Sequence, residues 1–210
     1  MTPHLLITVI FPFVFGVMAL FFFVIGLRGI VSKKPFVISA RWLFIVVLLG
    51  FSPAMFQFAW FPKPSGGPAI LVAIRWLIPV MFIVIIIFLY FTLRGYTAFA
   101  VTDTSFREGL LASLEKLNLP HEETLATIKL PTIGADLQVA VQSWIGTGQL
   151  KAKQREFSTV LRDIVKGMNE YYQSGVVTKV NLTCCIFYVV IGVLLGVFGG
   201  VFFFAFGTTN

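Results

Sequence analysis

The chain has 210 residues, of which 58% are hydrophobic and 12% are charged, and its formal net charge is +7. Soluble domains typically carry about 25% charged residues, so this composition excludes a conventional soluble protein and indicates a lipid bilayer. The two cysteines are adjacent, at Cys184 and Cys185. Neighbouring cysteines rarely bridge each other, which excludes a framework of disulfides.

The positive charge is unevenly distributed along the chain. All nine acidic residues and ten of the sixteen basic residues lie in the segment 94–181, which therefore carries a net charge of only +1. The remaining six basic residues flank apolar runs and have no acidic neighbours. This distribution is typical of membrane-flanking charge rather than of a phosphate-binding surface. We therefore expect the lipid bilayer, and no nucleic acid, as a partner.

Four apolar runs predict membrane-spanning helices. Each has close to or more than the ~20 residues that cross a bilayer core of ~30 Å. No basic region precedes the first run and no small-residue cleavage site follows it, so we expect a retained helix rather than a signal peptide. Residues 1–93 would then hold three spans and residues 182–210 the fourth. The predicted spans are residues 5–27, 42–60, about 69–93 and about 183–206.

The basic residues also predict an orientation, because cytoplasmic loops are enriched in Lys and Arg. The loop after the first span carries Arg28, Lys33, Lys34 and Arg41, whereas the region around the second loop offers only Lys63 and Arg75. This asymmetry places the first loop and the segment 94–181 in the cytoplasm. We expect the N- and C-termini outside, in a multi-pass protein of the cell membrane.

The segment 94–181 reads as a soluble domain of the α+β class. Its predicted order is β-α-β-β-β-α, with strands at 96–101, 124–130, 135–144 and 149–153. A helix begins at Ser105, where the pattern Ser105-x-x-Glu108 predicts a capping box, and a second runs from about 157 to 172. The predicted fold class is thus an all-α membrane protein with a small inserted α+β domain on the cytoplasmic side.

Three glycines in the last predicted span form the most specific motif. Gly192, Gly196 and Gly200 are four residues apart, a spacing that places small residues on one helix face and lets another backbone approach closely. The pattern predicts helix packing, either against the other spans of the same chain or between chains. A protein partner or a homo-oligomer would then be held through the fourth span.

A few polar residues mark a candidate polar site within the spans. Arg75 is the only ionisable residue expected inside a span, and Gln57 lies in the second span near the helix breaker Pro53. Pro79 would face them from the third span. A broken helix there could line a polar cavity, which would fit a small oligomeric transporter or channel. Snorkelling of Arg75 to lipid phosphates is the simpler interpretation.

Catalytic and metal-binding patterns are missing from the sequence. It holds no glycine-rich phosphate loop, no nucleophile elbow and no H-E-x-x-H motif. His4 and His121 are far from each other and from the cysteines, so we expect no metal and no cofactor. The neighbours Glu122 and Glu123 would point to opposite faces of a strand, which is a poor geometry for acid–base catalysis. We assign no catalytic residue, and an enzyme is the less favoured class.

These observations favour an integral membrane accessory, assembly or scaffold protein whose cytoplasmic α+β domain mediates interactions. The alternative is the small oligomeric transporter or channel built around Pro53, Gln57, Pro79 and Arg75. The presence of a folded insert beside a helix-packing motif, without catalytic chemistry, favours the first interpretation.

Overall fold

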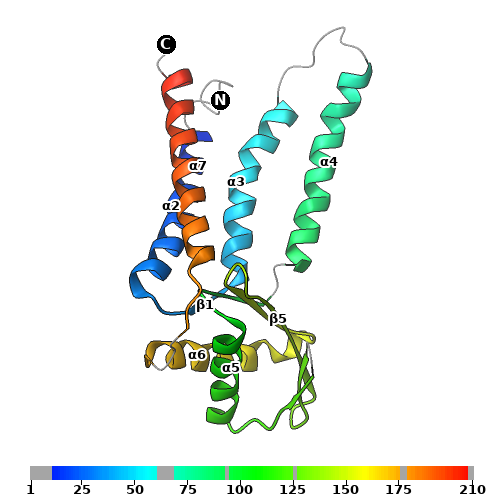
Figure 1. Cartoon of the computed structure of the whole chain (residues 1–210). Helices are drawn as coiled ribbons and strands as arrows, with labels where there is room; N and C mark the ends of the chain where they lie inside the picture. Colours follow the sequence, from blue (N-terminus) through cyan, green and yellow to red (C-terminus); the bar gives the residue numbers. More distant parts are fainter. Residues whose placement is uncertain (1–10, 61–68, 93–94, 125–126, 176–178, 208–210) are drawn as a thin grey trace. The chain divides into compact units, whose positions relative to one another are not determined.

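The computed structural model describes residues 11–60, 69–92, 95–124, 127–175 and 179–207 (Figure 1). The chain divides into two compact units that alternate along the sequence. The first unit comprises Met1–Phe23, Leu43–Leu93 and Val190–Asn210, and the second comprises Val24–Trp42 and Arg94–Val189. Three of the described helices therefore begin in one unit and end in the other.

Four long helices supply the described part of the first unit. They are α2 (Phe11–Ser32), α3 (Ala40–Trp60), α4 (Ala69–Thr92) and α7 (Thr183–Gly207). Of the described residues, Pro12–Ser32 and Thr183–Ala205 form helices long and apolar enough to cross a membrane. Shorter apolar stretches, Ala40–Gly50 and Pro79–Phe91, lie within α3 and α4. The structure thus supports two candidate spans, and the prediction of four remains a prediction.

Within the first unit, α2 contacts both α7 and α3. The rings of Phe15 and Phe198 meet edge to face, with centroids 5.5 Å apart, and join α2 to α7. A side chain built at Gly50 of α3 would overlap Met18 of α2, which shows how closely these two helices approach. Aromatic contact between Phe44 and Tyr90, at 5.8 Å, links α3 to α4.

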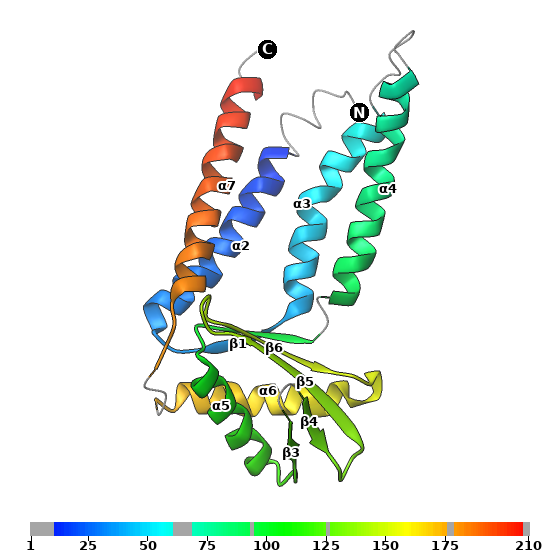
Figure 2. The same cartoon turned by 45° about the vertical axis from the view of Figure 1, so that its right-hand side comes forward.

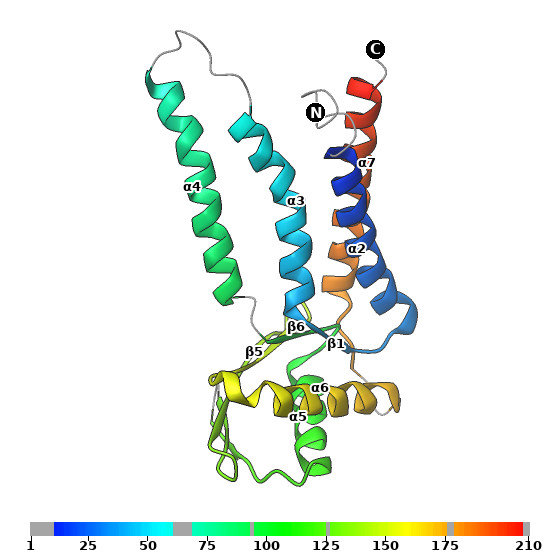
Figure 3. The same cartoon turned by 180° about the vertical axis from the view of Figure 1, so that it is seen from behind.

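The second unit is built on a six-stranded antiparallel sheet with the order β1-β2-β6-β5-β4-β3 (Figure 2). Two helices, α5 (Asp103–Lys116) and α6 (Ser158–Gln173), lie on the same side of this sheet, as Figures 2 and 3 show. The short 3-10 helix η2 (Arg155–Phe157) precedes α6. The strands are β1 (Phe36–Ser39), β2 (Tyr96–Phe99), β3 (Glu122–Glu123), β4 (Thr127–Leu130), β5 (Ala135–Gln142) and β6 (Thr147–Ala152).

Alternation along the strands explains the position of the core. Successive side chains of a strand point to opposite faces, so every second residue of β5 and β6 faces α5 and α6. Leu137 and Leu150 are 1% exposed on this face, and Phe106, Ile164 and Met168 of the two helices are fully buried against it. A single hydrophobic core therefore lies between the sheet and the helix pair.

On the opposite face of the sheet, aromatic contacts between described residues gather at β1 and β2. There Phe36 and Phe99 stack at 5.3 Å, and Tyr188 from the start of α7 packs edge to face on Phe99 at 5.5 Å. Arg28, near the end of α2, lies 5.1 Å above the Phe36 ring in a cation–π contact. The ends of both membrane-capable helices are thus part of the second unit, and they rest on the face turned away from α5 and α6.

Comparison with the predicted elements confirms the α+β class and shows two local differences. The predicted strand 124–130 corresponds to β4, with β3 as a separate two-residue strand before it. The capping box lies three residues earlier than predicted, because Thr102 is the N-cap and exchanges bonds with Ser105 rather than Ser105 with Glu108. The Ser105 hydroxyl accepts the backbone N–H of Thr102, which is the bond that the prediction assigned to the Glu108 carboxylate. Glu108 is exposed and takes no part in the capping box.

The sheet also contains a strand that the sequence did not predict. β1 comes from the basic segment 28–41, which the pattern identifies only as a loop between two spans. It pairs antiparallel with β2, with Phe36 opposite Phe99 and Ser39 opposite Tyr96. The predicted domain 94–181 therefore folds together with residues from before the second apolar run.

Candidate functional site

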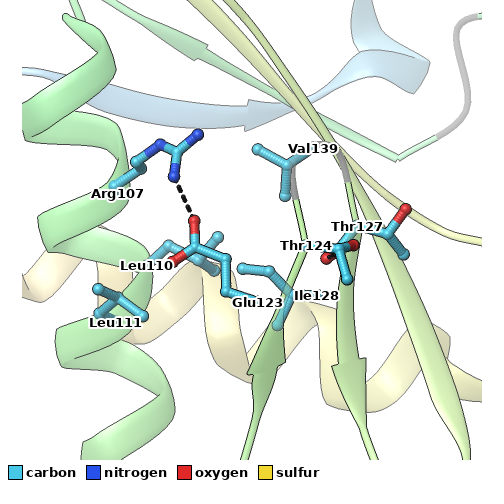
Figure 4. Close-up of a pocket in the computed structure, with 8 residues that line it drawn as sticks. All are labelled: Arg107, Leu110, Leu111, Glu123, Thr124, Thr127, Ile128 and Val139. Carbon is cyan, nitrogen blue, oxygen red and sulfur yellow. Dashed lines mark hydrogen bonds and ion pairs between the residues drawn. The ribbon is translucent and has the colours of Figure 1, made fainter.

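A hollow opens between α5 and the strands β3, β4 and β5 of the second unit (Figure 4). It encloses about 290 Å³ including its open mouth. This volume counts open solvent, and the enclosed space is far smaller than the ~300 Å³ at which pockets for small ligands usually begin, so the hollow is a shallow recess. The residues that line it are Arg107, Leu110, Leu111, Glu123, Thr124, Thr127, Ile128 and Val139.

The inner wall of the hollow is apolar. Leu110 and Ile128 belong to the hydrophobic core, whereas Leu111 and Val139 are only partly buried. Helical spacing explains the wall on α5, because Arg107 and Leu111 lie four residues apart and share one helix face. Val139 points toward the same side from the middle of β5, where alternation places it on the core face of the sheet.

The rim of the hollow is charged. Arg107 forms an ion pair with Glu123 across the mouth and a second, at 3.4 Å, with Asp103 one turn earlier on α5. The side chains of Arg107 and Glu123 are 43% and 36% exposed, so solvent screens their pairing. Asp103 and Glu123 are two carboxylates around the one guanidinium of Arg107. The rim favours a partner that brings positive charge beside an apolar side chain.

A tight hairpin positions Glu123 at the rim. Glu122 and Glu123 pair with Lys129 and Ile128 of β4. The chain reverses where the N–H and hydroxyl of Thr124 both donate to the carbonyl of Thr127, at 2.9 and 2.7 Å. Glu123 therefore approaches α5 from the edge of the sheet. Because Glu122 and Glu123 are adjacent on one strand, Glu123 alone of the two lines the hollow.

A second polar cluster joins the sheet to the start of α7. The Cys184 thiol donates to the carbonyl of Gly146 at 3.3 Å and accepts the N–H of Ala100 at 3.4 Å. The backbone N–H of Cys184 donates to the carbonyl of Ile145 at 2.7 Å. Ala100 has a φ of 61°, a left-handed conformation that costs a residue with a side chain some strain. This strained connection is held by the cysteine, which gives the buried thiol a structural role.

Cys185 fills the space between α7 and the end of α2. A side chain built at Gly29 would overlap the Cys185 sulfur and come within 3.3 Å of the Phe36 ring. One built at Gly26 would lie 2.8 Å from the backbone nitrogen of Val189. Only glycine permits this approach of the two helices. The sulfurs of Cys184 and Cys185 lie 3.7 Å apart as free thiols.

The three glycines predicted to share a packing face occupy different environments. A side chain at Gly192 would lie 2.8 Å from the backbone of both Ala19 and Phe23 of α2, whereas one at Gly200 would meet nothing within 4 Å. Gly196 is exposed, and its nearest neighbour would be the Ala19 side chain at 3.7 Å. Gly199 is the second glycine that meets α2. Each step of four residues turns ~40° around the helix axis, so Gly196 and Gly200 move away from the face on which Gly192 lies. A step of seven residues returns to nearly the same face, and Gly199 is seven residues after Gly192.

The predicted polar site falls largely outside the described part of the chain. The side chains of Gln57, Arg75 and Pro53 are among the residues that the structure does not describe. Pro79 lies inside α4, and the helix continues through it from Ala69 to Thr92. The prediction of a polar cavity at these residues stays a prediction.

Metal ligands do not gather anywhere in the described residues, since no group of three or more His, Cys, Asp or Glu side chains lies together there. His121 faces the carbonyl of Leu119 at 3.5 Å, which is at the limit of a hydrogen bond. His4 lies outside the described residues.

Comparisons with protein families, with curated proteins and with solved structures found no match to this chain. The site must therefore be interpreted from its own geometry. The hollow was not predicted from the sequence, because it combines residues of α5 with residues of strands that follow later in the chain. The paired spacing of Arg107 and Leu111 was its only local signal.

Proposed function

We propose that the chain is a multi-pass membrane protein that acts as an accessory, assembly or scaffold subunit, and that its α+β domain binds another protein. The hollow beside α5 carries this proposal. A small recess with an apolar wall and a charged rim is the form in which protein interfaces accept an anchoring side chain.

The sheet edges support the choice of the hollow, because neither edge is open for an added strand. At β1, the side-chain amide of Asn169 on α6 accepts the N–H of Val37 at 2.8 Å and donates to its carbonyl at 3.1 Å. At the other edge, β3 has only two residues, both glutamates. Short, charged or covered edges prevent strand addition. Recognition by strand addition is therefore disfavoured, and a recess is the better recognition surface.

Four spans and a cytoplasmic domain complete the proposal. The apolar lengths of α2 and α7 support two spans, and α3 and α4, with 21 and 24 residues, are long enough at ~1.5 Å per residue to supply the other two. The excess of basic residues between α2 and α3 supports a cytoplasmic position for the domain. Its partner would carry an apolar side chain flanked by Lys or Arg.

Site-specific photo-crosslinking in native membranes tests the proposal. A photoreactive phenylalanine analogue at Leu111, in the wall of the hollow, should give a discrete crosslinked species of increased mass. The same analogue at Arg162, exposed on α6, is the control and should give none. Adding Val139→Phe, which fills the hollow from β5, should remove the species.

Folding of the variants is checked by thermal unfolding in detergent, so that loss of the crosslink is not confused with loss of structure. Equal crosslinking from Leu111 and Arg162, or a Leu111 crosslink that survives Val139→Phe in a folded protein, would contradict a role for the hollow.

A further inference from the structure

The turn between β5 and β6 exposes a large aromatic side chain. Trp144 is 78% exposed, more than any other large hydrophobic residue described in this unit. An isolated tryptophan in water leaves a large apolar surface uncovered, while its indole N–H needs a polar partner. These two requirements are met together at a membrane–water interface, where tryptophan is enriched.

The turn is fixed to the beginning of α7. The side-chain N–H of Asn181 donates to the Ser143 carbonyl at 2.5 Å, and the N–H of Cys184 donates to the Ile145 carbonyl at 2.7 Å. The side-chain oxygen of Asn181 also accepts the N–H of Thr183, which caps the helix at its first residue. The turn that carries Trp144 is therefore bonded to the start of α7.

The face of the sheet opposite α5 and α6, here called the open face, contacts the ends of α2 and α7. The ends of α2 and α7 rest on Phe36 and Phe99, and these two residues lie on the face opposite the α5–α6 layer. Beyond that contact, the same face carries mostly polar side chains, among them residues of both charges, and Ile38 of β1 is its further large apolar residue. On β4, β5 and β6 the face is formed by Thr127, Lys129, Asp136, Gln138, Ala140, Gln142, Thr147, Gln149 and Lys151.

The helix ends of the second unit carry further residues of the interfacial type. Arg28 is exposed near the end of α2, and Arg41 is exposed at the start of α3. Trp42 follows Arg41 and is 60% exposed. Arginine and tryptophan at the ends of apolar helices are typical of contact with lipid headgroups. A protein partner at this face would need an apolar centre, which the open face lacks.

We propose that the β5–β6 turn is a membrane anchor: Trp144 enters the headgroup region of the leaflet from which α7 starts, and the open sheet face lies toward the same headgroups. This inference rests on the proposed function, because it requires α7 to span the bilayer. It adds a lipid-binding surface that is distinct from the hollow, which lies on the α5 side of the sheet.

Depth-dependent quenching of tryptophan fluorescence in phosphatidylcholine vesicles tests the anchor. A full-length variant with Trp42→Phe, Trp60→Phe and Trp76→Phe leaves Trp144 as the only tryptophan. Its emission should be blue-shifted relative to tryptophan in water. Lipids with a quencher near the headgroup should quench it at least twofold more than lipids with the quencher at the chain end. Emission at the wavelength of water-exposed tryptophan, quenched by aqueous iodide and not by lipid, would overturn the inference.

A control separates failure of the anchor from failure of the span. In the same background, Trp144→Phe with Leu194→Trp places the only tryptophan in the middle of α7, at a position that is 63% exposed. The deep quencher should now act most strongly. If this control is not quenched by lipid, the proposed span and the anchor both fail. If the control is quenched while Trp144 is not, the anchor alone fails.

Discussion

The side chains that decide the structure of the α+β domain are mostly small or buried. Gly26 and Gly29 let α2 approach Cys185, and the Cys184 thiol holds the left-handed Ala100 in place. Tyr172 differs from these residues because it is large and carries a buried polar group that is not hydrogen-bonded to any described residue. It is fully buried in the core, and its hydroxyl has no hydrogen-bond partner in the described structure.

Replacing Tyr172 by phenylalanine should therefore leave the domain as stable or more stable, by about 1 kcal/mol, because an unsatisfied buried hydroxyl is costly. Burial, with a smaller contribution from Tyr171, raises the pKa of Tyr172. In the unfolded chain the phenol ionises near pH 10, whereas in the folded protein it stays neutral to a higher pH.

The sign of the pH effect follows from this difference. The unfolded state loses its proton first, so the wild type should lose stability as the pH rises above about 10, while Tyr172→Phe should lose less. Thermal unfolding of both proteins in detergent, at pH 8 and at pH 10.5, measures this difference. A larger alkaline loss in the variant would show that the buried hydroxyl is not the titrating group.

At the scale of elements, β1 ties the connection between α2 and α3 into the sheet. Asn169 holds the outer edge of this strand by bonding both backbone groups of Val37, and Lys34 adds a bond to the Gln173 carbonyl at 2.8 Å. The contact joins α6 to a strand that lies 132 residues away in the sequence.

Asn169→Asp should destabilise the domain by about 1–3 kcal/mol, because the carboxylate cannot donate to the Val37 carbonyl and leaves it without its partner. The reverse change at an exposed position of the same helix, Asp163→Asn, is the control and should shift stability by less than about 0.5 kcal/mol. Denaturation in detergent compares the two. Equal stability of both variants would mean that the edge of β1 does not depend on Asn169.

The packing of α7 on α2 makes a second prediction at this scale. Gly192→Ala would place a methyl group 2.8 Å from the backbone of α2, an overlap that should cost about 1–3 kcal/mol. Gly196→Ala, with its nearest neighbour at 3.7 Å, should be tolerated. Unfolding temperatures in detergent distinguish the two. Equal destabilisation by both substitutions would instead assign Gly192 and Gly196 to one packing face, as the four-residue pattern predicts.

Local patterns predicted most elements of the domain, but not the contacts between distant segments. Alternation in the strand Ala135–Gln142 and helical spacing in the two amphipathic helices are properties of neighbouring residues, and the structure has these elements where the patterns place them. β1 has only four residues, and it becomes a strand through pairing with β2 some sixty residues later. The hollow likewise depends on how α5 packs on the sheet, which no single segment encodes.

At the scale of the whole molecule, the two compact units are interleaved along the chain. The second unit takes residues from before the second apolar run and from the start of the last helix, so its fold requires the ends of α2 and α7.

Cysteine labelling in intact cells tests the proposed topology most directly. The native thiols are at most 1% exposed, so the wild type provides a low background. Lys166→Cys places an exposed thiol on α6, whereas Gly148 is a poor position because a side chain there would meet the Phe106 ring. Pro64→Cys lies between α3 and α4. With a membrane-impermeant maleimide, Pro64→Cys should be labelled in intact cells and Lys166→Cys only after permeabilisation. Labelling of Lys166→Cys in intact cells would contradict the cytoplasmic domain, and equal labelling of both sites would contradict the spans themselves.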